Sequence, residues 1–153
     1  GHDTYKRDIH EPTIVKQPKT ENTIGSDGQA DILVSSIDLA PTILAYADVE
    51  IPTFIQGRSL YSALEGGDKH TRDAVLIEYF AHENPFIWTA KIDYKAVIVG
   101  PYKLVKWNLY DNEYELYNLQ DDPRELNNLA KQQAYKTKFT SMLGILKPET
   151  LNA

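Results

Sequence analysis

The chain has 153 residues and a formal net charge of −6, with 42% hydrophobic and 25% charged residues. These proportions are typical of a globular protein with a real core. The negative charge disfavours a nucleic-acid partner, because phosphates favour a basic face. No apolar run reaches the roughly 18 residues of a membrane span. The absence of cysteine excludes disulfides, thiol nucleophiles and cysteine-ligated metal sites.

The first predicted element is a short strand at Thr13–Val15, where β-branched residues lie between two prolines. The segment that follows, up to Asp31, is polar and holds two glycines, which predicts an exposed loop. An amphipathic helix then begins near Leu39, with Ser36 or Asp38 as its N-cap. A second, short helix is predicted after Ser59 and ends at two glycines.

The second half of the chain is predicted to form three or four antiparallel strands followed by a helix. The strand segments are DAVLIEYF, YKAVIV, YKLVKW and YELYNL, and Gly100-Pro101 lies at a turn between the middle two. Asp121 and Asp122 precede a proline and indicate a turn with a side-chain cap. The helix is predicted over residues 132–146, where large apolar residues form one stripe that packs on the sheet.

One loop has the composition of a binding site. His82, Glu83, Asn84 and Trp88 fall within a few residues of each other, between two predicted strands. Polar groups beside large aromatic side chains can hold a polar ligand. The alternative is that the aromatic residues anchor the loop to the sheet while the polar groups face water. No histidine pair has metal-ligand spacing, and no phosphate-binding glycine loop is present.

Five segments, in order, resemble the sulfatase family. They are YKRDIHEPTIVKQP, SSIDLAPTILAYADVEIPTFIQGRSL, RDAVLIEYF, YKAVIVGPYKLVKW and ELYNLQDDPRELNNLA. The second resembles the family pattern D-L-x-P-T-L-L followed by G-x-S-L, and the last resembles E-L-Y-D-L-x-x-D-P-x-E-x-x-N-L-A. They are spread in order between residues 5 and 130, a span that takes in most of the chain.

The resemblance implies an α+β chain with two parts. Residues 1–67 would be the C-terminal end of an alkaline-phosphatase-like α/β catalytic domain. Residues 68–153 would be the small sulfatase C-terminal domain, an antiparallel sheet of three to four strands with a packed C-terminal helix. The implied function is the C-terminal portion of a sulfuric ester hydrolase, which shapes the substrate cleft and does not carry the nucleophile.

The family's cofactors would belong to the missing N-terminal portion. Family catalysis uses a formylglycine made within a C/S-x-P-S-R motif and a calcium ion, and this sequence has no such motif. We therefore expect no catalytic residue, metal ligand or sulfatase activity in this segment alone. The expected partners are the N-terminal catalytic portion and a sulfated small molecule or carbohydrate. The resemblance implies a periplasmic, secreted or lysosomal location.

Many family members carry a sulfate-contacting lysine shortly before the residue matched by Tyr5. This chain has Gly1 or His2 there, depending on the alignment, so His2 is the one candidate sulfate contact. Two other functions stay open. The chain can belong to a related phosphoester or phosphonate-ester hydrolase, or be a non-catalytic binding module derived from a sulfatase. The sequence upstream of Gly1 would distinguish them.

Overall fold

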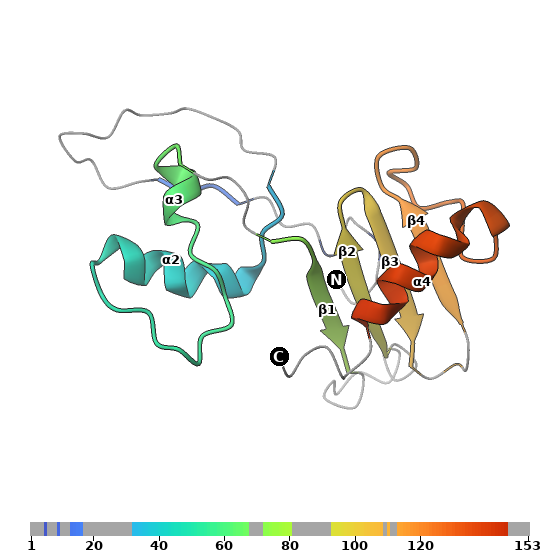
Figure 1. Ribbon diagram of the computed structural model, residues 1–153, viewed down its shortest axis with the longest axis horizontal. Helices are drawn as coiled ribbons and strands as arrows, with labels where there is room; N and C mark the ends of the chain where they lie inside the picture. The colour runs from blue at the N-terminus through green and yellow to red at the C-terminus, as the bar shows by residue number, and fades with distance from the viewer. Residues whose placement is uncertain are drawn as a thin grey trace. The chain divides into compact units, whose positions relative to one another are not determined.

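Four strands in the second half of the chain form one sheet in the computed structural model, in the order β1-β2-β3-β4 (Figure 1). They are β1 (Val75–Tyr79), β2 (Tyr94–Val99), β3 (Tyr102–Trp107) and β4 (Tyr114–Asn118). The structure describes residues 13–16, 32–67, 72–80, 93–108 and 113–146, together with Tyr5, Ile9 and Tyr110. The predicted strand segments are therefore confirmed.

The central hairpin joins β2 to β3 through Gly100 and Pro101. The two strands are antiparallel, with a register that runs from Tyr94 opposite Trp107 to Val99 opposite Tyr102. Gly100 has a φ of +56°, a left-handed conformation that costs glycine little and other residues more. Strand β4 adds antiparallel to the free edge of β3. The predicted turn thus sets the register of β2 against β3.

Helix α4 (Lys136–Ile145) covers one face of the sheet, after a short 3-10 turn, η4 (Gln133–Tyr135) (Figure 1). Phe139 packs edge-on against Tyr114, with ring centroids 5.3 Å apart. Met142 and Leu146 are buried, and on the sheet side Leu104 and Leu116 are fully buried. The predicted apolar stripe is confirmed, because its members face the sheet.

The opposite face of the sheet carries a different set of side chains. Successive strand residues point to alternate faces, so Lys103, Val105 and Trp107 lie on the face away from α4. A buried cluster there contains Tyr94, Ala96 and Val105, with Ile77, Tyr79 and Trp107 packed around it. This face is therefore more aromatic and more polar than the face beneath α4.

The chain divides into two compact units, one formed by Thr13–Val75 and the other by Gly1–Pro12 with Leu76–Ala153. The first unit contains the 3-10 turn η1 (Ser36–Asp38) and helices α2 (Leu39–Tyr46) and α3 (Tyr61–Leu64). None of the described helices is both long and apolar enough to cross a membrane. The assignment of residues 1–67 and 68–153 to two family domains stays a prediction.

The structure corrects two local predictions. Thr13–Lys16 has no regular secondary structure, because a strand needs a neighbour to accept and donate its backbone hydrogen bonds. Asp38 directly precedes α2, but its side chain makes no capping hydrogen bond to that helix. Its carboxylate is buried and bonds elsewhere, as described below.

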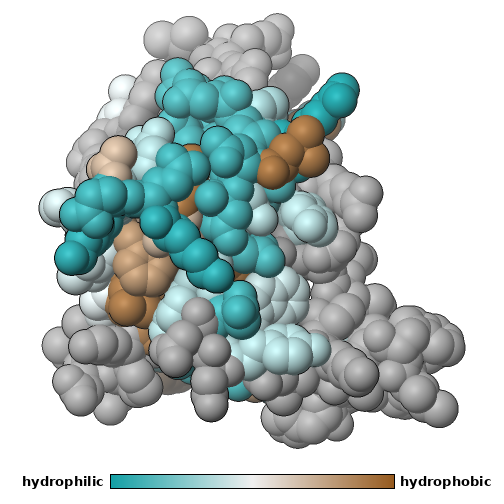
Figure 2. Space-filling view, turned by 90° about the vertical axis from the view of Figure 1, so that its right-hand side faces the viewer, coloured by the Kyte–Doolittle hydropathy of each residue, from teal (hydrophilic) through white to brown (hydrophobic). Residues whose placement is uncertain are grey.

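The described residues on one face of the sheet unit are mostly polar (Figure 2). Figure 2 shows one face on which hydrophilic residues predominate and the hydrophobic areas are small and separate. Surfaces of this kind are normal for the solvent-facing side of a globular protein. The apolar residues of α4 are accordingly turned toward the sheet.

Candidate functional site

The predicted ligand-binding residues cannot be placed on the sheet. His82, Glu83, Asn84 and Trp88 lie outside the described residues, and so does His2, the candidate sulfate contact. The other two histidines, His10 and His70, also lie outside them. The binding role of the loop therefore stays a prediction, and the site is built here from the described residues on either side of it.

Both ends of the predicted binding loop are fixed to the sheet. The loop leaves after Phe80, at the end of β1, and returns at Asp93, before β2. Asn108 donates its side-chain amide to Asp93 Oδ1 at 2.5 Å and its backbone N–H to Asp93 O at 2.8 Å. Lys95 Nζ lies 2.5 Å from Glu78 Oε1 and 5.9 Å from the Phe80 ring centroid. These contacts hold the two ends of the loop at one end of the sheet.

A row of aromatic side chains lies on the face of the sheet away from α4. Tyr79 stacks on Tyr94 with ring centroids 5.8 Å apart, and Tyr94 meets Trp107 edge-on at 5.7 Å. Aromatic pairs of this geometry stabilise a sheet beyond the area they bury. The row begins at Tyr79, next to Phe80, the last described residue before the predicted binding loop.

Glu115 on β4 continues this row with a charged group. Its Oε1 accepts the indole N–H of Trp107 at 3.1 Å, and its Oε2 accepts the hydroxyl of Tyr117 at 3.2 Å. Burial raises the pKa of Tyr117 above its ordinary value of about 10, and the neighbouring Glu115 carboxylate raises it further. Tyr117 is thus protonated at neutral pH and donates its hydroxyl proton to Glu115.

A buried ion pair lies beside Tyr117. Lys103 on β3 is fully buried, and its ammonium contacts the carboxylate of Glu125, which is also buried. The sequence analysis missed both residues, because a lysine in an alternating strand is usually solvent-facing. The indication in the sequence was that Lys103 and Glu125 each lie in a segment that resembles the sulfatase family.

The family-like segment around Asp38 is held together by hydrogen bonds and an ion pair. Asp38 is fully buried, and its Oδ1 accepts the Arg58 N–H at 2.8 Å and contacts the Arg72 guanidinium. Its Oδ2 accepts the Ser35 N–H at 2.8 Å. Thr42 receives the Leu60 N–H at 2.9 Å on its hydroxyl. Asp38 and Thr42 therefore join the start of helix α2 to the segment before α3.

Gly57 lies in the same family-like segment, where it packs against the backbone of Ile37. A Cβ atom at this position would lie 1.9 Å from the carbonyl oxygen of Ile37, which is closer than any real contact. The glycine is needed because the two backbone segments pass each other without room for a side chain. This explains the glycine of the G-x-S-L pattern in steric terms, while Ser59 accepts the Tyr61 N–H at 3.2 Å and Leu60 is buried.

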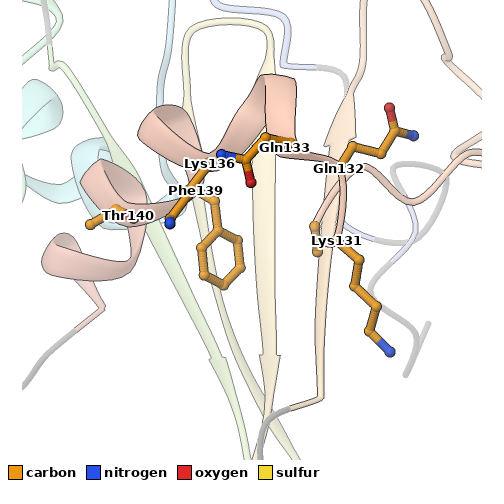
Figure 3. A pocket seen from close by; sticks show the side chains of 7 residues that line it. Lys131, Gln132, Gln133, Lys136, Phe139 and Thr140 are labelled. Atoms are coloured by element: carbon orange, nitrogen blue, oxygen red, sulfur yellow. The ribbon is translucent and has the colours of Figure 1, made fainter.

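A surface pocket of about 290 Å³ lies where the chain enters α4 (Figure 3). It is lined by Ala130, Lys131, Gln132, Gln133, Lys136, Phe139 and Thr140. Its two lysines favour an anion, but all its polar lining residues are exposed. Exposed lysines alone do not make a specific site, so we assign no function to this pocket.

The described residues contain neither grouped metal ligands nor a buried carboxylate without a cationic partner. Among them, no three His, Cys, Asp or Glu side chains are grouped so that they could hold a metal ion. The buried carboxylates of Asp38 and Glu125 are each engaged by a cation. A calcium site therefore does not fit the described residues.

Comparison with known proteins identifies the family. The model of the N-sulphoglucosamine sulphohydrolase C-terminal family matches residues 3–149, and the chain belongs to this family. An N-acetylglucosamine-6-O-sulfatase of Bacteroides thetaiotaomicron is 31% identical over 137 residues, which are 89% of this chain and 24% of that protein. The sulfatase resemblance of the sequence is confirmed.

Solved structures share the fold. One, of a protein in complex with its substrate D-glucosamine-2-N,6-O-disulfate, has a TM-score of 0.63 and 32% identity, covering 71% of this chain and 22% of that one. A phosphonate monoester hydrolase of Agrobacterium radiobacter also has a TM-score of 0.63, at 23% identity, covering 77% and 25%. This second likeness concerns the fold alone. The chain spans about a quarter of the length of these proteins.

Proposed function

We propose that the chain is the C-terminal portion of a sulfatase that removes sulfate from a sulfated amino sugar. The observation that carries this is the family match across residues 3–149 in a chain a quarter as long as its sulfatase relative. The amino-sugar substrate is proposed because that relative is an N-acetylglucosamine-6-O-sulfatase. A structure neighbour with 32% identity holds a disulfated glucosamine.

The exposed apolar residues of the Thr13–Val75 unit support this proposal. Ile14, Phe54 and Ile43 are 94%, 82% and 67% exposed. Large exposed apolar side chains commonly mark a surface that another part of the protein covers. A preceding catalytic portion of the same polypeptide would cover them.

In this proposal the chain contributes to substrate selection and not to bond cleavage. The sheet and its aromatic row hold the loop that contains His82 and Trp88, which we propose as a contact to the sugar. The formylglycine and the calcium ion of the family would lie in the preceding portion. The chain has no cysteine, and its described residues have no grouped metal ligands.

The test is to express the complete upstream reading frame together with a formylglycine-generating enzyme. The 153-residue chain, purified in parallel, is the control. We expect the complete protein to release sulfate from N-acetylglucosamine-6-sulfate and the chain alone to release none. Turnover by the chain alone would contradict the proposal. Hydrolysis of a phosphonate monoester without any sulfate ester would instead favour the phosphonate-ester hydrolases.

Loop substitutions test the substrate contact separately. Replacing His82 or Trp88 by alanine in the complete protein should raise KM for the sulfated sugar at least several-fold, with little change in thermal stability. An unchanged substrate profile would show that the loop only anchors itself to the sheet.

A further inference from the structure

Lys103 and Glu125 form an ion pair that is buried inside the sheet unit. Lysine and glutamate are almost never fully buried unless they are paired, because removing both charges from water is costly. Lys103 is 0% exposed and Glu125 is 4% exposed, and the two side chains are in direct contact. Two apolar side chains would fill this position at lower cost. The pair carries no net charge, but it holds an ammonium group at a fixed position inside the fold, which two apolar side chains cannot do.

The loop after β4 is shaped to deliver Glu125 to this position. Glu125 has a φ of +57°, a left-handed conformation that is unfavourable for a residue with a side chain. Its N–H donates to Asp122 O at 3.0 Å, and Asp122 Oδ2 accepts the Asn127 N–H at 2.8 Å. These bonds hold the strained residue in place, so the carboxylate meets Lys103 in one geometry.

The ammonium of Lys103 also faces two aromatic rings. It lies 5.6 Å from the ring centroid of Tyr117, its neighbour across the β3–β4 ladder, and 5.9 Å from that of Tyr5. A lysine within about 6 Å of a ring centroid is attracted to the face of the ring, and more strongly where water is excluded. Tyr5 belongs to the start of the chain, far from β3 in sequence.

Tyr5 is also the beginning of a local turn. Its carbonyl oxygen accepts the Ile9 N–H at 3.3 Å. The Gly1–Pro12 segment belongs to the same compact unit as the sheet, although residues 13–75 separate the two in sequence. A contact between Tyr5 and the sheet is therefore within one unit.

We infer that Lys103 is a positioning residue: its charge, held by Glu125, binds the ring of Tyr5 and fixes the start of the chain on the C-terminal sheet. This rests on the proposed function for its consequence. If a catalytic portion precedes Gly1, this contact sets the point at which that portion joins the sheet that carries the substrate-selecting loop. The contact is a link within the polypeptide and not a ligand site.

The decisive experiment measures amide hydrogen exchange by NMR in the 153-residue chain, without substrate. Lys103→Met combined with Glu125→Met removes both charges together, so neither is left buried and unpaired. We expect exchange at the Ile9 amide to rise about tenfold, while the amides of Val97 and Val105 in the sheet stay protected. Unchanged exchange at Ile9 in this folded variant would overturn the inference.

A second pair of variants decides the matter if the double substitution prevents folding. Tyr5→Phe keeps the ring and should leave the Ile9 amide as protected as in the wild type. Tyr5→Leu removes the ring and should raise exchange at Ile9 about tenfold. Equal exchange in the two variants would overturn the inference. None of these results bears on whether the complete protein hydrolyses sulfate esters.

In the complete protein, Tyr5→Leu separates positioning from substrate contact. Because Tyr5 acts through the joining of the two portions, we expect kcat to fall several-fold with KM for the sugar unchanged, and Tyr5→Phe to restore it. A rise in KM alone would place Tyr5 at the substrate and overturn its positioning role.

Discussion

Two motif residues that the sequence shares with sulfatases, Asp38 and Gly57, have steric and hydrogen-bonding roles in the fold. Asp38 accepts hydrogen bonds from two backbone amides and binds a guanidinium, and Gly57 leaves room for the Ile37 carbonyl. None of these groups is left free for a reaction. At the residue scale, these two motif residues are therefore explained by packing and hydrogen bonding within the fold.

Replacing Gly57 by alanine tests whether the close approach to the Ile37 carbonyl requires glycine. The new Cβ would lie 1.9 Å from the Ile37 oxygen, so one of the two backbone segments must shift. We expect a loss of about 2–4 kcal/mol in the free energy of unfolding, measured by urea denaturation. Gly144→Ala is the matched control, because a Cβ there has no neighbour within 4 Å and alanine favours the helix. Equal stability of the two variants would contradict the steric explanation.

Tyr117 predicts how stability depends on alkaline pH. Its pKa is raised in the folded chain, mainly by burial and then by Glu115, so the folded state holds this proton more tightly than the unfolded state. Its stabilising contribution is therefore complete below about pH 10 and is lost as the pH rises above that value. Tyr117→Phe removes this dependence. Urea denaturation of both proteins from pH 9 upward should show the wild type losing stability faster, and parallel curves would contradict the raised pKa.

Some contacts between single residues could not be predicted from the sequence. Arg72 and Asp38 are 34 positions apart, and nothing in either local pattern indicates that they meet. Lys103 shares its strand face with Val105 and Trp107, but a lysine side chain usually reaches solvent, so the sequence did not indicate its complete burial. Pairings between distant segments depend on the tertiary structure, whereas strand and turn patterns are local.

At the scale of elements, the sheet and α4 could be predicted because their patterns are complete within a few residues. The stripe around Met142 specifies the buried face of α4. The segment YELYNL indicated a strand, but not that β4 is buried on both faces, through Leu116 and Tyr117. The strand predicted at Thr13–Val15 failed for the opposite reason. Its composition is suited to a strand, but a strand exists only with a partner, and the described residues provide none there.

The segment after β4 acts as a partial fifth strand through the side chain of Asn128. Its Oδ1 accepts the Leu116 N–H at 3.0 Å and its Nδ2 donates to Tyr114 O at 3.1 Å, so it satisfies two backbone groups of β4. Asn128→Ala should lower the free energy of unfolding by about 1–3 kcal/mol, because the Leu116 amide loses its acceptor. Urea denaturation measures this loss.

Asn127→Ala is the matched control for that substitution. Asn127 is an exposed neighbour whose side chain makes only a long contact, 3.4 Å, with Gln132. Surface changes of this kind usually stay within about 0.5 kcal/mol. If both alanine variants lost the same stability, the strand-like role of Asn128 would be wrong.

At the scale of the whole molecule, the two compact units differ in how well they bury their apolar residues. The sheet unit has a fully buried set under α4, including Leu104 and Leu116. In the Thr13–Val75 unit, Ile43 projects from α2 with 67% of its surface exposed, and Phe54 is 82% exposed. The proposed catalytic portion would cover the second set, which predicts opposite effects of one substitution in the isolated chain and in the complete protein.

Ile43→Glu tests this directly. In the isolated chain it removes exposed apolar surface, so we expect less self-association in analytical ultracentrifugation and less binding of a hydrophobic dye. In the complete protein it places a charge at a covered position, so we expect the yield of folded enzyme to fall several-fold. Thr137→Glu, at an exposed position of α4, is the control and should change neither measurement. A complete protein that tolerates Ile43→Glu as well as Thr137→Glu would show that this face of α2 stays in solvent, and that the preceding portion docks elsewhere.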